Sequence, residues 1–600
     1  MLTIRLLGRP AIEHDGRPGR SPRGRKAWAL LAYVLLSERP PSRQRLAELL
    51  FGEADDPLGA LRWTLAELRR SLGRSDVLTG DPVGGLENVV VDVGVAADQL
   101  ADPAPLLDAA GELLEGVYLP YSPEFESWLS VERYRVAGMV EARLRQAAVA
   151  LLAAGRAGEA LRYAQRAVLS NPVDEGNHEL LVRSLAMTGD GVAARRQVAL
   201  AEDVLRRELG VTASAALHDA ATVGIESGRT PPLGGRSAAL SQLEAGRAAI
   251  VAGAVDAGVQ CLRRAVVEAG RTRDTALRAR ALVALGAALV HAVRGRDQEG
   301  ALVLHEGLDH ATRAGDRALA VTAQRELGFV EVQAGRRATA DTWLASAQML
   351  ATDDAELAGI LGVRGQNASD VGDYPEAFAH LGESIERARR CGDDRQRAWS
   401  QSILARAHLL RSEHSQAAVA LADCLDVVRA QRWMVFLPWP QTLRAELDLR
   451  AGDFETAADT LERAWTLACQ VGDPCWEGMA ARGLGLLNAG RGDDAAATGW
   501  LGEATVRCNR MPDRYHWLHA HVLDTAIEVA LDRDEPERAG PLVATLAPLA
   551  ARCELRELVV RAQVHRHRLG DPTALRSARS LAADIDNPAL AGLLAEQPLV

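Results

Sequence analysis

The chain has 600 residues, 48% of them hydrophobic and 25% charged, which is the balance of a folded globular protein with about four domains. Its longest apolar stretch, Ala27 to Leu36, is well short of the ~20 residues that a membrane-spanning helix needs, and the first residues, MLTIRLLGRP, lack the pattern of a secretory signal. Seven cysteines without a CxxC pair predict free thiols in a reducing compartment, so we expect a cytoplasmic protein that does not contact membranes.

Charge is distributed unevenly along the chain. Residues 1–75 contain 14 Lys and Arg against 8 Asp and Glu, a balance of +6 in a chain whose net charge is −11. The remaining residues therefore carry −17, and a polyanion is expected to bind only at the N-terminal end. The single lysine, Lys26, lies in RGRKA, so no GxxxxGK(S/T) phosphate loop exists and a P-loop ATPase module is excluded.

The first domain is predicted to span residues 1–97. Short β-prone runs and the turn Asp15-Gly16 predict a small antiparallel sheet in the first 25 residues. Three helices are expected over RKAWALLAYVLL, SRQRLAELLF and DPLGALRWTLAELRRSLG, with N-caps at Ser42 and Asp56 and a stop at Gly73. The run DVLTGDPVGGLENVVVDV then predicts a hairpin. This order is typical of a winged helix-turn-helix, and a generic α+β domain is the alternative.

The third of these helices has two chemically different faces. Its leucines share one stripe that we expect to be buried: Leu58, Leu61, Leu65, Leu68 and Leu72. The opposite face and its flanks contain small residues, a tryptophan and arginines: Gly59, Arg62, Trp63, Thr64, Ala66, Glu67, Arg69 and Arg70. Because arginines present forked donors to phosphates and guanine edges, we interpret this face as a major-groove surface rather than a solvated basic face. Glu67 fits only if it pairs with Arg70 or accepts from a cytosine.

Phosphate anchors are expected at the starts of the first two helices, where backbone N–H groups and basic side chains coincide. They are Arg23, Arg25 and Lys26 at the first helix, and Arg43 and Arg45 at the second. The tip of the predicted wing, GDPVGGLEN, has no basic residue and contains Asp81 and Glu87. We therefore expect the wing to contribute little to DNA affinity.

The run RKAWALLAYVLLSERPPSRQRLAELLFGEADDPLGALRWTLAELRRSLG resembles the DNA-binding domain of the Streptomyces antibiotic regulatory protein family, which has an OmpR-like winged helix. Three later segments resemble that family's bacterial transcriptional activation domain, a helical, tetratricopeptide-like module: LLEGVYLPYSPEFESWLSVER, AGRAGEALRYAQRAVLSNPVDEGNHELLVRSLAMTGD and VLRRELGVTASAALHDA. The resemblance implies binding to promoter repeats in double-stranded DNA, often as side-by-side protomers that form a dimer on DNA, and activation through contact with RNA polymerase.

A few positions depart from the pattern of this family. Phe51-Gly52 stands where the family has Trp-Pro, Val198 where it has an aromatic residue, and Ala213 where it has a proline. The wing also contains Glu-Asn-Val-Val instead of Gly-Tyr-x-Leu. We place the activation domain at residues 98–226, where apolar spacing independently predicts helices, and a Pro- and Gly-rich linker at residues 227–237.

A period of about 40 residues runs through residues 238–600. It aligns eight leucines, of which the first seven follow a small residue by four positions: Leu262, Leu304, Leu344, Leu381, Leu421, Leu461, Leu501 and Leu542. Small residues at a fixed helical site let a neighbouring helix pack closely, which predicts an all-α helical-hairpin solenoid of tetratricopeptide-like type, with HEAT-type repeats as the alternative. The fold class is therefore mainly α, and the concave groove of the array is expected to take an unknown protein or small-molecule partner.

Two clusters in the array could suggest a small-molecule or metal site. Trp433, Phe436 and Trp439 are concentrated in WMVFLPWPQ, for which core packing is the favoured interpretation and a ligand pocket the alternative. The three histidines of YHWLHAH do not share one helix face and have no cysteine or HExxH nearby, so we expect packing or surface histidines and no metal.

The sequence contains neither a GxSxG motif nor a GxGxxG after a strand, and we predict that the protein is not an enzyme and needs no cofactor. The leading interpretation is a DNA-binding transcriptional regulator, an activator by family resemblance, with a C-terminal repeat domain that senses a ligand or binds a partner. The alternative is a repeat-based interaction scaffold whose N-terminal domain no longer binds specific DNA.

Overall fold

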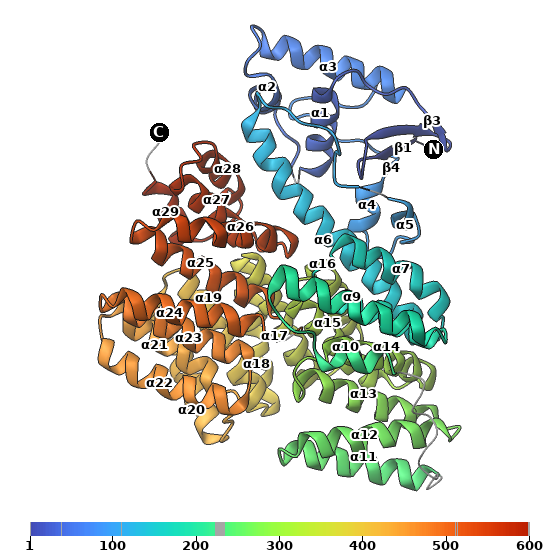
Figure 1. Ribbon diagram of the computed structural model, residues 1–600, viewed down its shortest axis with the longest axis vertical. Helices are drawn as coiled ribbons and strands as arrows, with labels where there is room; N and C mark the ends of the chain where they lie inside the picture. Colours follow the sequence, from blue (N-terminus) through green and yellow to red (C-terminus); the bar gives the residue numbers. More distant parts are fainter. Residues whose placement is uncertain are drawn as a thin grey trace.

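The computed structural model describes residues 2–37, 39–109, 111–222, 235–510, 512 and 514–597. Within these ranges the chain has a small N-terminal sheet and 29 helices, most of them in a C-terminal array of helical hairpins (Figure 1). The predicted mainly α fold class is therefore confirmed. The predicted linker, residues 227–237, lies mostly outside the described residues, which resume at residue 235.

In the described ranges, no helix combines the length and the apolar character that crossing a bilayer requires.

The N-terminal domain combines a four-stranded sheet with three helices. The strand order is β3-β2-β1-β4, in which β1 pairs antiparallel with β2 and parallel with β4. The strands are β1 (Leu2–Arg5), β2 (Ala11–His14), β3 (Arg17–Pro18) and β4 (Val89–Val91), and the helices are α1 (Arg25–Leu36), α2 (Arg43–Phe51) and α3 (Pro57–Leu72). Asp15 and Gly16 both have positive φ, 49° and 74°, so the predicted Asp-Gly turn joins β2 to β3.

The ends of α2 and α3 follow the predicted capping residues. The Ser42 side chain accepts a hydrogen bond from the Arg45 N–H at 3.1 Å, and Asp56 accepts one from the Gly59 N–H at 2.8 Å. Gly73 ends α3 in the left-handed conformation. The predicted leucine stripe of α3 is buried except at its first position, because Leu58 lies in the first turn and is 40% exposed.

The predicted hairpin after α3 is wrong, since β4 is the one strand that the described residues form there. Residues 77–83 instead fold back onto α2 and α3. The Val83 N–H donates to the Pro41 carbonyl at 2.8 Å, and Leu78 and Asn88 have φ of 54° and 57°, which interrupts an extended backbone. The Val83 N–H is therefore bonded to the segment before α2 and not to a partner strand.

The activation segment is helical, as predicted, and is organised around one long helix. It follows the short helix α4 (Asp92–Ala97), and its helices are α5 (Pro105–Asp108), α6 (Pro123–Ala153), α7 (Ala157–Ser170), α8 (Glu175–Met187), α9 (Gly191–Leu209) and α10 (Ala215–Ala220). Helix α6 has 31 residues and packs against α7 and α8. Figure 1 shows it running from α2 into the middle of the molecule.

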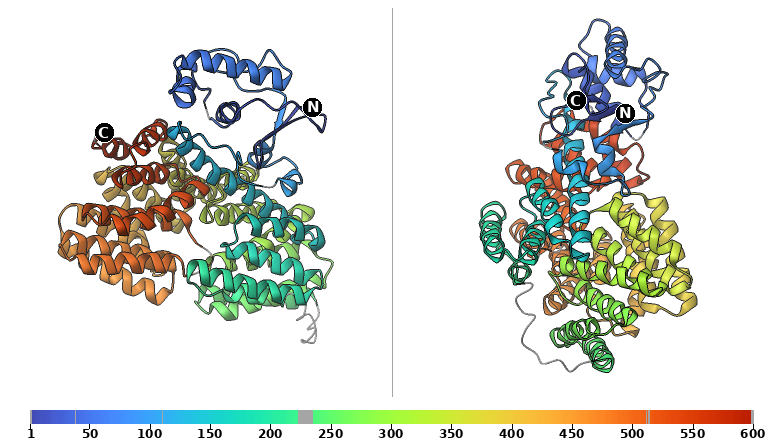
Figure 2. Two further views of the ribbon diagram at one scale, coloured as in Figure 1. Left: turned by 45° about the horizontal axis from the view of Figure 1, so that its top comes forward. Right: turned by 90° about the vertical axis from the view of Figure 1, so that its right-hand side faces the viewer.

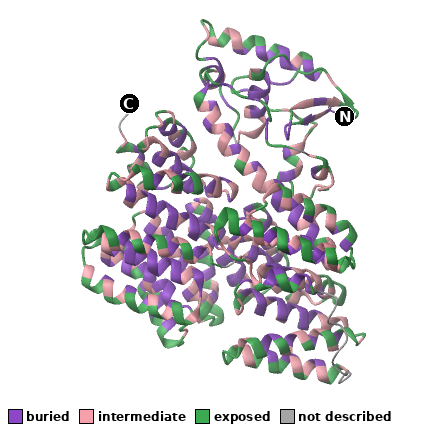
Figure 3. Ribbon diagram, in the orientation of Figure 1, coloured by how far each residue is buried: buried purple, intermediate pink, exposed green. Residues whose placement is uncertain are grey.

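The repeat array consists of helical hairpins stacked side by side. Its helices are α11 (Arg236–Val251), α12 (Val255–Gly270), α13 (Thr275–His291), α14 (Asp297–Ala314), α15 (Arg317–Gln333), α16 (Arg337–Leu350), α17 (Asp354–Val371), α18 (Tyr374–Cys391), α19 (Asp394–Leu410), α20 (His414–Ala430), α21 (Pro438–Arg450), α22 (Phe454–Val471), α23 (Pro474–Gly490), α24 (Asp494–Cys508), α25 (His516–Asp532), α26 (Pro536–Arg552), α27 (Arg556–Arg568), α28 (Ala574–Ala582) and α29 (Pro588–Ala595). The first helices of successive hairpins contact one another, and buried residues fill the interior (Figure 3). This arrangement confirms the predicted solenoid.

The period of the leucines reflects one repeated contact between the two helices of a hairpin. Each of the first seven leucines is buried in the second helix. In five hairpins it packs on a glycine of the first helix, where a Cβ would lie 2.5–2.7 Å from the leucine side chain: Gly246, Gly286, Gly328, Gly365 and Gly485. In α26, Ala539 and Val543 take the buried positions, one residue beyond Arg538 and Leu542, so the break in the sequence pattern is a shift of register.

Hydrogen bonds and ion pairs join the middle of the array to its C-terminal part. Asp370, in α17, accepts hydrogen bonds from the Arg406 guanidinium at 2.7 Å and from the Tyr515 hydroxyl at 2.8 Å, and all three side chains are buried. The guanidinium of Arg337 pairs with Asp370 at 2.9 Å and donates to the Cys553 carbonyl. Since buried charges are stable only when they are paired, these bonds hold the start of α25 and the end of α26 against α16, α17 and α19.

The array also docks on the activation segment through α6, which contacts α14, α26 and α28 (Figure 2). Helix α26 ends so close to α6 that a Cβ on Gly138 would lie 2.4 Å from the carbonyl oxygen of Arg552. The Arg552 guanidinium in turn pairs with Glu141 of α6. A residue without a side chain is therefore required at this contact.

Replacing Gly138 with alanine is expected to loosen this docking, because the new Cβ would force α26 away from α6. Gly158→Ala, in the first turn of α7, is the matched control, since a Cβ there meets open space; it should leave stability unchanged or raise it slightly. Hydrogen exchange of the full chain should become faster in α6 and α26 for Gly138→Ala and should not for Gly158→Ala. Equal behaviour of the two variants would contradict the close contact.

His519 is expected to make the array sensitive to acid. Its side chain is buried and its Nε2 lies 3.1 Å from the Asn509 amide nitrogen. Burial and the nearby Arg514 charge lower the pKa of His519 from 6.5 to about 4. Because the fold favours the neutral form, this stability is present above pH 6.5 and is lost as the pH falls toward 4, by at most about 3 kcal/mol. Thermal unfolding between pH 4 and 8 should show a flatter pH dependence for His519→Gln; an unchanged slope would refute the assignment.

Candidate nucleic-acid interface

The solvent face of α3 presents arginines and an aromatic side chain at the edge of the molecule. Figure 1 shows α3 at the end opposite α11 and α12, with no repeat helix over it. Trp63 is 56% exposed, and the side chains of Arg62 and Arg70 are also more than half exposed. These three predicted site residues therefore lie on an accessible face of α3.

A groove of about 580 Å³ lies directly beside Trp63, and we call it the basic aromatic groove. It is lined by the first turn of α1, by α3, by the end of α2 and by residues 118–121, namely Arg23, Gly24, Arg25, Lys26, Ala27, Phe51, Ala60, Trp63, Thr64, Tyr118, Leu119, Pro120 and Tyr121. The structure thus brings together five of the predicted site residues, from the start of α1 and from α3: Arg23, Arg25, Lys26, Trp63 and Thr64.

The electrostatics of the groove favour an anion. Arg23 and Arg25 are exposed, and they flank the positive end of the α1 dipole, whose N-cap Gly24 provides no side-chain hydrogen bond. The charge of Lys26 is partly neutralised, because its ammonium pairs with the Glu53 carboxylate. This pairing keeps the pKa of Glu53 below its ordinary value. Its ammonium also lies 5.1 Å from the centre of the Phe51 ring.

Tyr118 and Tyr121 belong to this groove and were missed by the sequence prediction. They are 57% and 79% exposed, respectively, and they precede α6. The Tyr118 carbonyl accepts a hydrogen bond from the Arg25 guanidinium at 3.4 Å. The sequence contains one signal for them: two tyrosines flank Leu119-Pro120 in a segment without apolar periodicity. Such a segment leaves large side chains in water, and exposed large side chains often mark contact surfaces.

Four other predicted site residues are held by bonds within the protein. The Arg69 guanidinium donates to the carbonyls of Val77 at 2.9 Å and Leu78 at 2.7 Å, and Thr64 is buried with its hydroxyl donating to Ala60 at 2.9 Å. Arg43 Nε donates to the Gly80 carbonyl at 2.8 Å. Arg45 pairs with Glu124 at the start of α6. These contacts anchor the segment after α3 and join the first domain to α6.

Glu67 lies in a different place from the one predicted for it. Its side chain is 1% exposed, not on the solvent face, and it pairs with Arg70 at 2.8 Å and with Arg20 at 3.3 Å. The buried face of α3 is wider than its leucine stripe, because the segment that contains Arg20 covers it. Of the two possibilities for Glu67, pairing with Arg70 is the one that the structure contains.

The aromatic cluster noted in the array belongs to its core. Phe436 and Trp439 are buried, Trp433 stacks on Phe436 with ring centres 4.3 Å apart, and the Trp439 indole donates to the Ser402 hydroxyl at 3.0 Å. These contacts support core packing at the start of α21. Among the described residues, no group of His, Cys, Asp and Glu has an arrangement that could hold a metal ion.

Two family models match parts of the chain. Residues 92–222 match the bacterial transcriptional activator domain, and residues 356–430 match a tetratricopeptide repeat. The first match covers the segment that resembles the activation domain of the Streptomyces antibiotic regulatory proteins, and that resemblance is confirmed. Both families are of regulatory or protein-interaction type. No curated protein matches the sequence.

Several solved structures are similar to parts of this chain, at low sequence identity and low TM-score. A Rap protein complexed with competence and sporulation factor is 12% identical, with a TM-score of 0.43 over 60% of this chain and 99% of that one. Mycobacterium tuberculosis EmbR in complex with a low-affinity phosphopeptide is 18% identical, with a TM-score of 0.28 over 37% of this chain and 64% of that one. NprR in complex with its cognate peptide NprX is 12% identical, with a TM-score of 0.42 over 57% and 98%.

Replacing Arg69 with alanine is expected to destabilise the segment after α3. Two hydrogen bonds from a charged donor would be lost, and a bond of this kind contributes about 1.5–3 kcal/mol. In the full chain, hydrogen exchange of residues 77–83 should therefore accelerate by at least about tenfold. Arg62→Ala removes the same charge from an exposed position and should leave exchange unchanged. Unchanged protection in Arg69→Ala would show that the two carbonyl contacts are not stabilising.

Proposed function

Because the chain carries a bacterial transcriptional activator domain followed by tetratricopeptide repeats, we propose that it is a DNA-binding transcriptional activator. It binds double-stranded DNA through α3, contacts RNA polymerase through its activation segment and uses the repeat array to bind a regulatory partner. It acts in the cytoplasm, without enzymatic activity or a cofactor. The observation that supports DNA binding best is the exposure of Trp63 between Arg62 and Arg70, beside the basic aromatic groove.

The side chains of α3 have the chemistry of major-groove recognition. Arg62 and Arg70 can each give a pair of parallel hydrogen bonds to a guanine edge, and Trp63 offers an apolar surface to a thymine methyl group. Ala66, on the same face, is small enough for the helix to approach the bases. Glu67 does not oppose this approach, because it is buried and its charge is shared between Arg70 and Arg20.

The basic aromatic groove supplies contacts of the kind that position a protein on the DNA backbone. Arg23 and Arg25 are exposed at the N-terminus of α1, where a phosphate is also attracted by the helix dipole. Binding through such contacts releases counterions, so affinity should fall steeply as salt rises. Arg43, Arg45 and Arg69 are not part of this proposed interface, since their side chains are bonded within the protein and, unlike that of Arg70, are only partly exposed. Thr64 lines the groove, but its hydroxyl is bonded to the Ala60 carbonyl.

The alternative is an interaction scaffold that does not bind specific DNA. The internal use of three of the predicted basic residues, Arg43, Arg45 and Arg69, favours it, because the N-terminal charge available to DNA is smaller than the sequence suggests. The exposed arginines of α3 distinguish the two functions, since only a sequence-specific DNA-binding protein needs them to select among DNA sequences.

The full chain is expected to retain a few promoter fragments from sheared genomic DNA of the source strain, with an affinity that weakens steeply between 50 and 200 mM salt. The combined variant Arg62→Ala, Trp63→Ala and Arg70→Ala should bind the retained fragments at least about 100-fold more weakly, because each forked arginine–base contact contributes about 1–3 kcal/mol.

The control for this experiment is Arg429→Ala combined with Arg463→Ala, which removes two exposed arginines from the outer surface of the array. It should bind the same fragments as the unmodified chain does. If the unmodified chain enriches no fragment over the combined α3 variant, the protein is a scaffold and not a sequence-specific regulator.

A further inference from the structure

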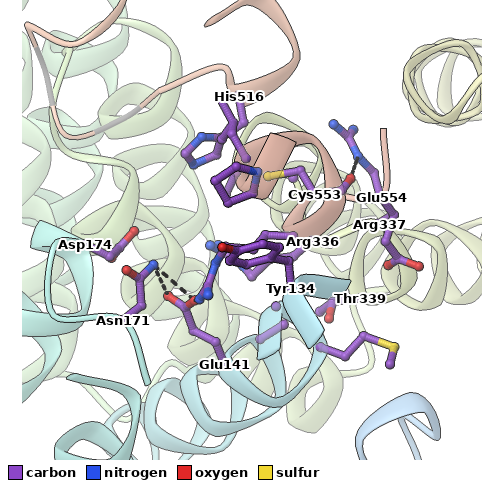
Figure 4. A pocket seen from close by; sticks show the side chains of 18 of the residues that line it. Tyr134, Glu141, Asn171, Asp174, Arg336, Arg337, Thr339, His516, Cys553 and Glu554 are labelled. Atoms are coloured by element: carbon purple, nitrogen blue, oxygen red, sulfur yellow. Dashed lines mark hydrogen bonds and ion pairs between the residues drawn. The ribbon is translucent and has the colours of Figure 1, made fainter. Parts of the chain in front are cut away.

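A pocket of about 330 Å³ lies where the repeat array meets the activation segment, and we call it the junction pocket. Its walls come from α6, the α7–α8 turn, the turn before α16, residues 514–516 and the end of α26 (Figure 4). Ligand pockets of small molecules have volumes of about 300–1,000 Å³, so there is room for a compact organic molecule. The pocket is separate from α3 and from the basic aromatic groove.

The three carboxylates of the junction pocket are engaged within the protein. Glu141 pairs with Arg552 and accepts a hydrogen bond from the Asn171 amide at 3.2 Å, as Figure 4 shows for Asn171. Asp174 pairs with Arg145 at 3.1 Å. Glu554 also has an interaction partner. The acidic groups that could repel an anion are therefore largely neutralised.

Among the four arginines that line the pocket, Arg514 differs from the others. Arg336 pairs with Glu331, Arg337 with Asp370, and Arg552 with Glu141. Within the described part of the chain, Arg514 makes no ion pair or hydrogen bond. Burial lowers the pKa of its guanidinium, while the nearby charges of Asp174 and Glu175 act in the opposite direction.

Two further donors or acceptors at the pocket lack a partner among the described residues. They are Nδ1 of His516, two residues from Arg514, and Nη2 of Arg337, whose side chain is almost completely buried. Burial lowers the pKa of His516, so its ring is neutral at neutral pH. Water, an ion or a polar group of a ligand can satisfy such buried polar atoms.

The junction pocket also has apolar lining residues. They include Met139 of α6, Val173, and Pro548 and Leu549 of α26. A ligand that matches both kinds of lining residue therefore has a charged head and an apolar body. A hydrated inorganic ion would leave the apolar residues without contacts.

We propose that the junction pocket binds a small organic anion, with a carboxylate or phosphate head on Arg514 and an apolar body against Met139, Pro548 and Leu549. Such a ligand contacts α6 and α26 together, so its binding energy stabilises the docked arrangement of the array on the activation segment. The site makes the repeat array a sensor of an anionic metabolite. This inference does not depend on DNA binding.

Calorimetric titration of the full chain tests the proposal with three probes: benzoate, phenyl phosphate and inorganic phosphate. Benzoate or phenyl phosphate should bind one per chain with a Kd of about 1 mM, a usual affinity for a fragment of about ten atoms. The tighter of the two identifies the head group. Inorganic phosphate should bind at least tenfold more weakly, because it lacks the apolar body.

The Arg514→Ala variant should weaken binding of the aromatic probe at least tenfold, whereas Arg463→Ala, an exposed arginine of α22, should not change it. Arg514→Lys keeps the charge without the forked geometry and should bind with intermediate affinity, which separates loss of the site from a folding defect. The proposal is overturned if neither aromatic anion binds at concentrations up to about 10 mM, or if Arg514→Ala and Arg514→Lys bind as the unmodified chain does.

Discussion

The packing of α6 against three parts of the molecule is the constraint on which the rest of the structure depends. At its start, Glu124 pairs with Arg45 of the first domain and lies 3.7 Å from Arg576 of α28. In its middle, Gly138 allows the backbone of α26 to approach. Near its end, Arg145 bonds to Asp174 of its own segment and to Gln298 of α14. One rigid helix therefore sets the positions of the first domain, the activation segment and the repeats, and it also forms a wall of the junction pocket.

The same packing divides the basic residues of the first domain into two groups. Arg45 and Arg69 stabilise the protein, because they bond to a carboxylate and to backbone carbonyls that would otherwise lose hydrogen bonds. Arg62, Arg70 and the arginines at the start of α1 remain available to solvent. Some basic side chains of the N-terminal segment therefore stabilise the fold, and others are free to contact a polyanion. The second group is concentrated on α3 and in the groove beside it.

Local features of the fold were predictable from the sequence, and features that depend on distant segments were not. Ser42, Asp56 and the periodic leucines each act on their own helix or hairpin, so spacing alone revealed them. The missing wing hairpin, the burial of Glu67 and the place of Tyr118 depend on contacts between segments that are far apart in sequence. For the interface, the exposed face of α3 was predicted, whereas the internal bonds of the other arginines required the structure.

Transcription with purified RNA polymerase from a promoter fragment that the full chain retains tests the central claim most directly. If the chain is a DNA-binding activator, adding it should increase the amount of transcript severalfold, and the increase should require its binding sequence in the fragment. An unchanged or reduced amount of transcript at concentrations that occupy the fragment would contradict the account, because DNA binding would then not lead to activation.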